Sequence, residues 1–181
     1  MNLAPSSFSI CVWFNFAQTT AWARVFELGN TGSPNPTDSI FLYDYSTSTD
    51  LYFALVTGPS LTFTYKFPSS IVTGTWRHVC IVKGSSWTLY DNNVAVTTLT
   101  GNTVQVVRSA NYLGQSAYTG GTLFRGSIDE FRVYNVPLTA SQVLSLFAFR
   151  GTSLSLSNLY VPSSFDSVSG LVGYYTFQVR V

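Results

Sequence analysis

Short runs of alternating apolar and polar residues recur along almost the whole chain, and turn-forming stretches separate them. The runs are rich in aromatic and β-branched residues, a pattern typical of antiparallel strands that bury one face. The strands predicted from this pattern are Phe8–Phe16, Ala23–Leu28, Ser39–Tyr45, Asp50–Val56, Leu61–Phe67, Arg77–Lys83, Ser86–Tyr90, Val94–Leu99, Asn111–Gly114, Gly126–Tyr134, Leu154–Val161 and Gly170–Val181. Many short strands at this spacing predict an all-β fold, an antiparallel sandwich of two sheets.

One segment departs from the strand pattern and predicts a short helix. In the stretch LTASQVLSLFAF, Gln142 follows Thr139 by three residues, which is the spacing of a capping box. Val143, Leu144 and Phe147 then fall on one face of the helix and predict its buried side. We expect this helix to lie over a sheet edge or over the mouth of the sandwich.

The composition is that of a globular protein with few charges on its surface. Of the 181 residues, 46% are hydrophobic and only 9% are charged, whereas roughly 25% are charged in an average soluble domain. Ser and Thr are abundant, so hydroxyl groups rather than charges must hydrate much of the surface. Such a surface favours an extracellular or assembled protein.

Charge and hydropathy argue against two classes of partner. The formal net charge is +1 and the basic residues are scattered, whereas nucleic-acid binding needs a basic stripe that neutralises phosphates. No apolar run reaches the roughly 18–20 residues that a membrane span requires. We therefore expect no nucleic-acid partner and no membrane insertion.

Five motifs follow one another in an order that is known from one superfamily. They are FSICVWFNF, GTWRHVCIV, WTLYDNNVAV, NYLGQS and FRGSIDEFRVYNVPLTASQV. Together, over about residues 6–149, they resemble the laminin-G-like domains of the concanavalin A-like lectin superfamily. The last motif, a strand followed by Leu-Thr and a short helix, is the most specific of the five. The resemblance implies a jelly-roll sandwich, with carbohydrate as the expected ligand class.

The two cysteines of the chain each lie in an apolar, strand-like run. Both could be free thiols in the core, because cysteine is a common core residue. However, the contexts SICVW around Cys11 and RHVCIV around Cys80 resemble the pentraxin branch of the superfamily, in which these two strands carry a disulfide. The resemblance therefore implies a Cys11–Cys80 bond, and with it an oxidising location, extracellular or at the cell surface.

Catalysis needs a separate test, because the superfamily includes glycoside hydrolases. Those enzymes place two carboxylates across a cleft, and in a strand this requires acids at positions i and i+2. No predicted strand carries such a pair, and the adjacent Asp129 and Glu130 would point to opposite faces. The single histidine, His78, lies beside Cys80 in a strand and is expected to be structural. We therefore predict that the protein is not an enzyme.

Calcium is the one cofactor that the resemblance suggests. Pentraxin-like domains hold paired calcium ions with an acidic loop, but the matching residues 113–121 contain no acid. The resemblance is still consistent with one structural calcium, because it matches Asp129 and Asp38 to acidic ligands of related sandwiches. The alternatives are a turn-capping role for Asp38 and a buried contact of Asp129 with Arg132 or Arg24.

Several aromatic residues fall in or near loops and strand ends, where they could stack on a sugar ring. The ligand-binding residues predicted on this basis are Trp22, Tyr43, Asp44, Tyr45 and Tyr118, with Asp44 expected to bind sugar hydroxyls. The alternative is that these rings serve the sandwich core or the packing between subunits, since the chain is 16% aromatic.

The C-terminal stretch SGLVGYYTF resembles the opening strand of a laminin-G-like domain, and this resemblance implies a rotated order of motifs. A circular permutation, a tandem array of domains and strand donation between copies would each explain this order. The remaining alternative is a chance similarity of a short apolar strand. We expect residues 1–150 to form the sandwich core and residues 151–181 to form a Ser-rich connection and a final strand. That strand, residues 170–181, should complete a sheet edge in its own sandwich or in a neighbouring one.

These observations lead to one principal function and one alternative. The principal prediction is a non-catalytic extracellular recognition or adhesion module whose partner is a glycan or glycoprotein. The alternative is a structural subunit of an extracellular fibre or surface appendage, assembled by self-association through its termini.

Overall fold

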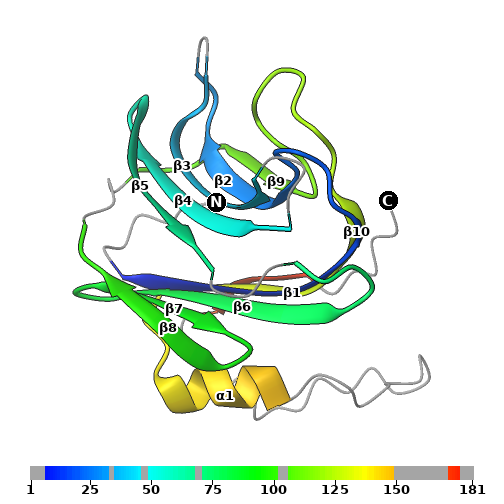
Figure 1. Ribbon diagram of the computed structural model, residues 1–181. Helices are drawn as coiled ribbons and strands as arrows, with labels where there is room; N and C mark the ends of the chain where they lie inside the picture. The colour runs from blue at the N-terminus through cyan, green and yellow to red at the C-terminus, as the bar shows by residue number, and fades with distance from the viewer. Residues whose placement is uncertain are drawn as a thin grey trace.

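Two antiparallel sheets packed face to face form a sandwich (Figure 1). The computed structural model describes residues 7–32, 35–45, 49–67, 71–101 and 106–148, and the backbone of residues 171–175. In this part of the chain, one sheet has six strands, in the spatial order β11 (Leu171–Tyr175), β10 (Arg125–Tyr134), β1 (Phe8–Gln18), β6 (Trp76–Lys83), β7 (Trp87–Asp91) and β8 (Val94–Leu99). The other sheet has five, in the order β5 (Ser60–Lys66), β4 (Leu51–Thr57), β3 (Thr37–Asp44), β2 (Arg24–Asn30) and β9 (Ala110–Leu113).

The predicted all-β jelly-roll sandwich is therefore confirmed. Each observed strand lies within or overlaps a predicted run, because alternating burial and turn residues mark the strand ends clearly. The predicted strand Leu154–Val161 lies outside the described residues, as do residues 176–181 of the final predicted strand.

The central strands of the six-stranded sheet, β1 and β6, are buried on both faces. On β1, the residues Ile10, Val12 and Phe14 point between the sheets and are at most 1% exposed. The intervening residues Cys11 and Trp13 face the opposite side and are also buried. Each fully buried apolar side chain contributes roughly 1.5–3 kcal/mol, so both faces of β1 stabilise the fold.

Helix α1 (Ala140–Ala148) covers the outer face of the six-stranded sheet, below the sandwich in Figure 1. The predicted capping box is present: the Thr139 amide donates to Gln142 Oε1 (2.8 Å), and the Gln142 amide donates to Thr139 Oγ1 (3.3 Å). The predicted buried face was partly wrong, because Leu146 is buried and Leu144 is 49% exposed. The helix lies on a sheet face rather than over an edge or the mouth of the sandwich, and Val143 and Leu146 are the residues that pack on this face.

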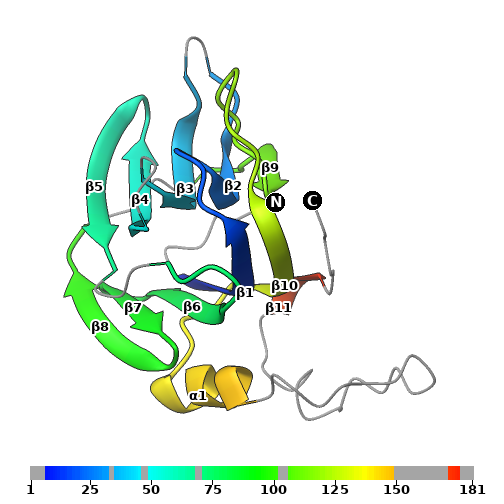
Figure 2. The ribbon, with the colours of Figure 1, turned by 45° about the vertical axis from the view of Figure 1, so that its right-hand side comes forward.

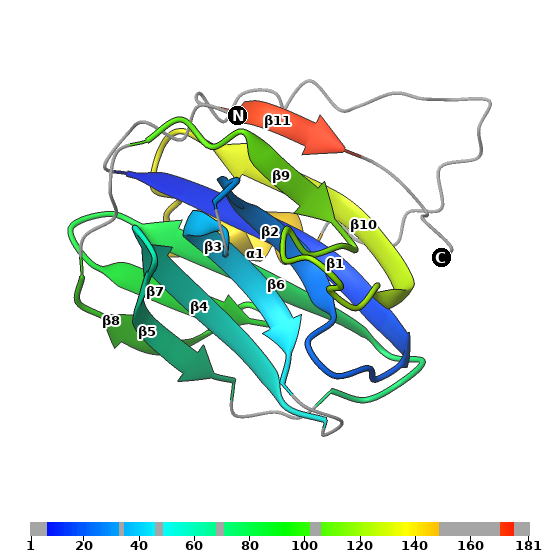
Figure 3. The ribbon, with the colours of Figure 1, turned by 90° about the horizontal axis from the view of Figure 1, so that it is seen from above.

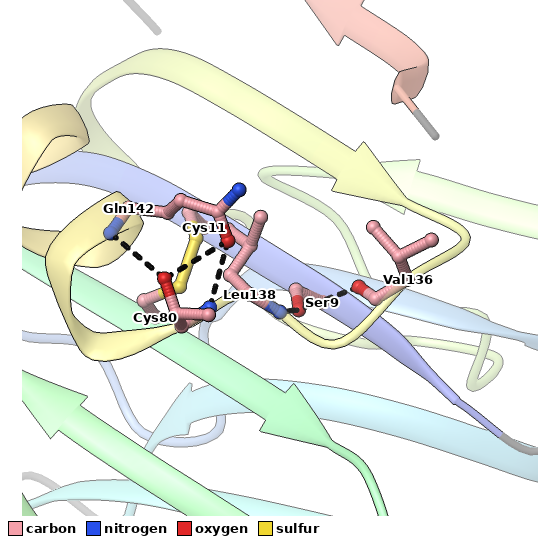
Figure 4. The surroundings of a disulfide bond; sticks show 7 residues. Ser9, Cys11, Cys80, Val136, Leu138 and Gln142 are labelled. Carbon is pink, nitrogen blue, oxygen red and sulfur yellow. Dashed lines mark hydrogen bonds between the residues drawn. A yellow bond between two sulfur atoms is a disulfide. The ribbon is translucent and has the colours of Figure 1, made fainter. Parts of the chain in front are cut away.

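The disulfide between Cys11 and Cys80 is confirmed. The two cysteines are directly opposite each other on β1 and β6, with Cα atoms 4.0 Å apart, and both are fully buried. Figure 4 shows the bond close to Leu138 and Gln142, where the chain enters α1. Nearby, Ser9 Oγ donates to the Val136 carbonyl and accepts from the Leu138 amide, each at 2.9 Å. These bonds fix the segment that leads into α1 against β1.

Strand β11 lies at the edge of the six-stranded sheet, antiparallel to β10 of the same chain (Figures 2 and 3). Phe131 is paired with Tyr175 and Arg132 with Tyr174. This pairing occupies the free backbone edge of β10 within the chain, which is the edge that a donated strand would otherwise use.

The double variant Cys11→Ala/Cys80→Ala should lower the free energy of unfolding by about 4 kcal/mol, because the bond closes a loop with a sequence separation of 69 residues. Urea unfolding followed by tryptophan fluorescence measures this loss. A titre of two free thiols in the unfolded, unreduced wild-type chain would show that the bond does not form.

Candidate functional site

A pocket of about 740 Å³ lies on the outer face of the five-stranded sheet, the face turned away from the core. Residues of β2, β3, β4 and β5 form its floor, and the segment 116–122 between β9 and β10 forms one wall. Figure 3 views the molecule from the side of this sheet. In the described part of the chain, no helix covers this face. Trp22 and Tyr45 are exposed on it, whereas Arg24, Phe41 and Tyr43 are buried at its base.

Strand alternation determines which residues of β3 and β4 reach the pocket. Leu42 and Phe53 point into the core between the sheets. Their neighbours Phe41, Tyr43 and Tyr52 point outward and form a separate aromatic cluster. The floor of the pocket is therefore apolar and aromatic, as ligand pockets usually are.

A register shift in β2 brings two charged side chains to the same outer face. Arg24 is opposite Tyr43 and Glu27 is opposite Phe41, with a shift between Arg24 and Phe26 in the pairing of β2 with β3. In a regular strand, residues three apart would point to opposite faces. The extra residue, typical of a β-bulge, lets both Arg24 and Glu27 face the pocket side.

The guanidinium of Arg24 lies among aromatic rings at the base of the pocket. Its Cζ atom is 4.2 Å from the ring centre of Phe41, 4.7 Å from that of Tyr43 and 5.7 Å from that of Tyr118. Arg24 Nε is 3.4 Å from Glu27 Oε2, and Nη1 donates to the Trp22 carbonyl at 3.3 Å. Burial lowers the pKa of Arg24, but a guanidinium still remains charged at neutral pH.

Glu27 holds the wall of the pocket in place. Its Oε2 atom accepts hydrogen bonds from Ser116 Oγ (3.0 Å) and from the Ala117 amide (3.1 Å). Ser116 Oγ also accepts from the Tyr118 amide at 3.1 Å. A Cβ atom on Gly121 would lie 2.5 Å from that of Ser116, so only glycine fits this close approach. One buried carboxylate thus connects β2 to the wall.

Exposed aromatic rings form the rim. Trp22 is 48% exposed and stacks on Tyr43, with ring centres 5.8 Å apart and planes at 8°. Tyr45 is 42% exposed and lies 4.9 Å from Trp22 and 5.1 Å from Tyr52, centre to centre. The rim therefore presents broad apolar faces to the solvent, beside the hydroxyl groups of the tyrosines.

Four of the five predicted ligand-binding residues line this pocket: Trp22, Tyr43, Tyr45 and Tyr118. Asp44 does not, and its expected contact with a ligand is corrected. It is fully buried, and its Oδ2 atom accepts from the Thr20 amide at 2.9 Å. The reason is strand alternation, which turns Asp44 inward between two outward-facing tyrosines.

The sequence reasoning did not identify Arg24, Phe41 and Ser116 as parts of a site. Phe41 could have been found because it lies two residues before Tyr43 on β3, and residues two apart in a strand point to the same face. Arg24 and Ser116 could not, because their places depend on the register shift in β2 and on the contacts of Glu27.

The two predicted calcium ligands lie in different sheets. Asp38 Oδ1 accepts from the Gly58 amide at 2.7 Å, which is the turn-capping contact considered as the alternative. Asp129 Oδ1 accepts from the Glu130 amide at 2.8 Å, and Arg132 forms an ion pair with Glu130. Among the described residues, no three His, Cys, Asp or Glu side chains gather as metal ligands. Asp38 and Asp129 therefore do not share one site, and a calcium ion at either of them stays a prediction.

A family model described as the concanavalin A-like lectin/glucanases superfamily matches residues 1–144 of the chain. This match confirms the resemblance seen in the motifs. Among curated protein sequences, none matches the chain. Within the described residues, no helix combines the length and the hydrophobicity needed to cross a membrane.

Solved structures share the fold. The chain is similar to CBM40 of the Ruminococcus gnavus IT-sialidase bound to α2,3-sialyllactose, with a TM-score of 0.66 and 16% identity over 80% of this chain and 84% of that one. It is similar to the SAP-like pentraxin of Limulus polyphemus (TM-score 0.59, 20% identity, 82% and 72% covered). It is also similar to domain 4 of the arabinanase AbnA from Geobacillus stearothermophilus, solved with arabinotriose (0.57, 23%, 78% and 66%).

Asp44→Asn should remove a pH dependence of stability. Burial outweighs the hydrogen bond from Thr20 and raises the pKa of the Asp44 carboxyl from 3.8 to about 6. Between these values the folded protein keeps a proton that the unfolded chain has released, so this group lowers the free energy of unfolding as the pH rises. Asp44→Asn lacks that decrease and should be more stable than wild type at neutral pH. Urea unfolding across this range checks the prediction, and parallel curves for the two proteins would contradict it.

Proposed function

The chain belongs to the concanavalin A-like lectin/glucanases superfamily, and we propose that it is a non-catalytic module that binds carbohydrate on the outer face of its five-stranded sheet. The observation that carries this proposal is the pocket itself, in which exposed aromatic rings form a rim above a buried, charged arginine. Pockets with an apolar lining and a few convergent polar groups are the usual form of small-ligand sites.

The chemistry of the rim suits a saccharide. A sugar ring has an apolar face of C–H groups and an equator of hydroxyls, so it needs a flat apolar surface with hydrogen-bonding groups beside it. Trp22 and Tyr45 supply the flat surfaces. Arg24, Thr64 and Ser116, which also line the pocket, supply polar groups. Solved structures with this fold hold sialyllactose and arabinotriose, which supports carbohydrate as the ligand class.

The same lining supports a binding role without catalysis. Glycoside hydrolysis needs two carboxylates across the cleft. The described residues that line the pocket include no Asp or Glu. Glu27, which lies behind Arg24, is fully buried and already binds Arg24, Ser116 and Ala117. It is therefore a structural carboxylate rather than an acid or base for the ligand.

The proposed location is extracellular or at the cell surface. The Cys11–Cys80 disulfide supports this, because such bonds persist in oxidising compartments. At that location, the proposed role is recognition of, or adhesion to, a glycan or glycoprotein. The alternative role, a fibre subunit that assembles through its termini, stays a prediction of the sequence, and the pairing of β11 with β10 of the same chain does not favour it.

Trp22→Ala should weaken saccharide binding by about tenfold or more, since exposed aromatic rings at binding sites commonly contribute over 1 kcal/mol. A glycan array identifies the ligand, and isothermal titration calorimetry then measures the affinity. Leu144→Ala is the matched control, because Leu144 is 49% exposed, close to the 48% of Trp22, but lies on α1 over the other sheet. Folded wild-type protein that binds no glycan, or an unchanged affinity in Trp22→Ala, would refute the proposed function.

A further inference from the structure

Trp22 is held in a backbone conformation that a bulky residue rarely adopts. Its φ angle is 67°, in the left-handed region, which is strained for a residue other than glycine. Such a conformation persists only when surrounding contacts impose it. The side chain that this conformation displays is the most exposed aromatic ring of the pocket rim.

Asp44 supplies those contacts through its backbone. The Trp22 amide donates to the Asp44 carbonyl, and the Asp44 amide donates to the Ala23 carbonyl, both at 2.9 Å. The Ala23 amide closes the turn by donating to the Thr20 carbonyl at 2.9 Å. The end of β3 and the turn at residues 20–23 are thus joined on both sides of Trp22.

The side chain of Asp44 adds a contact that no apolar residue could make. Its Oδ2 atom accepts from the Thr20 amide at 2.9 Å, at the start of the turn. The carboxylate is fully buried, and its Oδ1 atom has no hydrogen-bond partner. Burying an ionised carboxylate destabilises the folded protein. The hydrogen bond from the Thr20 amide is the contact that offsets this cost for Asp44. Hydrogen bonds from a backbone amide to a carboxylate are stronger than those between neutral groups.

We propose that Asp44 is the positioning residue of the pocket: from inside the sandwich it fixes the Thr20–Ala23 turn, so that Trp22 stays stacked on Tyr43 over the binding face. Asp44 touches no ligand and acts through Trp22. The proposal rests on the proposed function for its effect on binding, but its effect on Trp22 can be measured without any ligand.

The first test measures the accessibility of Trp22 in the free protein. Acrylamide quenching of tryptophan emission is recorded for wild type, Asp44→Val and Asp44→Asn, and the Trp22 contribution is obtained by difference from Trp22→Phe. Asp44→Val fills the buried space but cannot accept the Thr20 bond, so quenching of Trp22 should increase. Asp44→Asn keeps an oxygen acceptor for the Thr20 amide and should restore the wild-type value. If Asp44→Val does not fold, Asp44→Ala takes its place.

A matched control separates positioning from a general loss of rigidity. Ser9→Ala removes a buried hydroxyl that joins a loop to a strand on the other sheet. It should lower stability while leaving the quenching of Trp22 unchanged. Unchanged quenching in Asp44→Val, or an equal increase in Ser9→Ala, would overturn the proposal.

The second test is a double-mutant cycle on binding, with arabinotriose and 3′-sialyllactose as a neutral and an acidic probe. Asp44→Val and Trp22→Ala should each weaken binding by about tenfold, and the double variant should be no weaker than Trp22→Ala alone. Additive losses would overturn the proposal, because Asp44 would then act independently of Trp22. If neither saccharide binds the wild type, the proposed function loses its support, while the quenching result still decides the role of Asp44.

Discussion

The buried ion pair between Arg24 and Glu27 is the interaction on which the pocket depends. The arginine forms the base of the pocket against Phe41, while the glutamate fixes the wall by binding Ser116 and so brings Tyr118 over the arginine. Both side chains are almost fully buried, with exposed fractions of 6% and 0%. Losing one partner of such a pair typically costs about 3–5 kcal/mol, because the other charge is left unpaired. The floor and the wall of the site are therefore stabilised by the same contact.

The two sheets have different roles: the six-stranded sheet mainly stabilises the fold, and the five-stranded sheet carries the pocket. The central strands of the six-stranded sheet are buried on both faces, by the other sheet and by α1, and they carry the Cys11–Cys80 bond. The five-stranded sheet packs against the other sheet through its inner face, and its outer face carries the buried aromatic cluster that forms the floor of the pocket. A site on regular strands is held more precisely than one built only from loops. The turn that carries Trp22 is the exception, and the contacts of Asp44 compensate for it.

Strand positions could be predicted from the sequence because alternating apolar residues and turn residues are local signals. The disulfide could be predicted because the sequences around its two cysteines resemble a known branch of the superfamily. The tyrosines at positions 43 and 45, predicted to bind a ligand, both line the pocket, and their ligand-binding role stays a prediction. Their neighbour Asp44 was placed wrongly because adjacent residues of a strand face opposite sides, a rule that could have been applied from the sequence. The outward direction of both Arg24 and Glu27 could not be predicted, because a register shift changes strand parity and depends on pairing between distant segments.

The central claim is that a saccharide binds on the outer face of the five-stranded sheet, over Arg24 and against Trp22. The most direct measurement is an NMR titration of ¹⁵N-labelled protein with the glycan that binds most strongly on an array. The four tryptophan side chains give an internal comparison, because Trp13 and Trp87 are buried and Trp76 lies on the other sheet. We expect the indole signal of Trp22 and the Nε signal of Arg24 to shift with saturation, while those of Trp13 and Trp87 stay in place. Saturable shifts confined to α1 and the outer face of the six-stranded sheet, with Trp22 unchanged, would contradict the account.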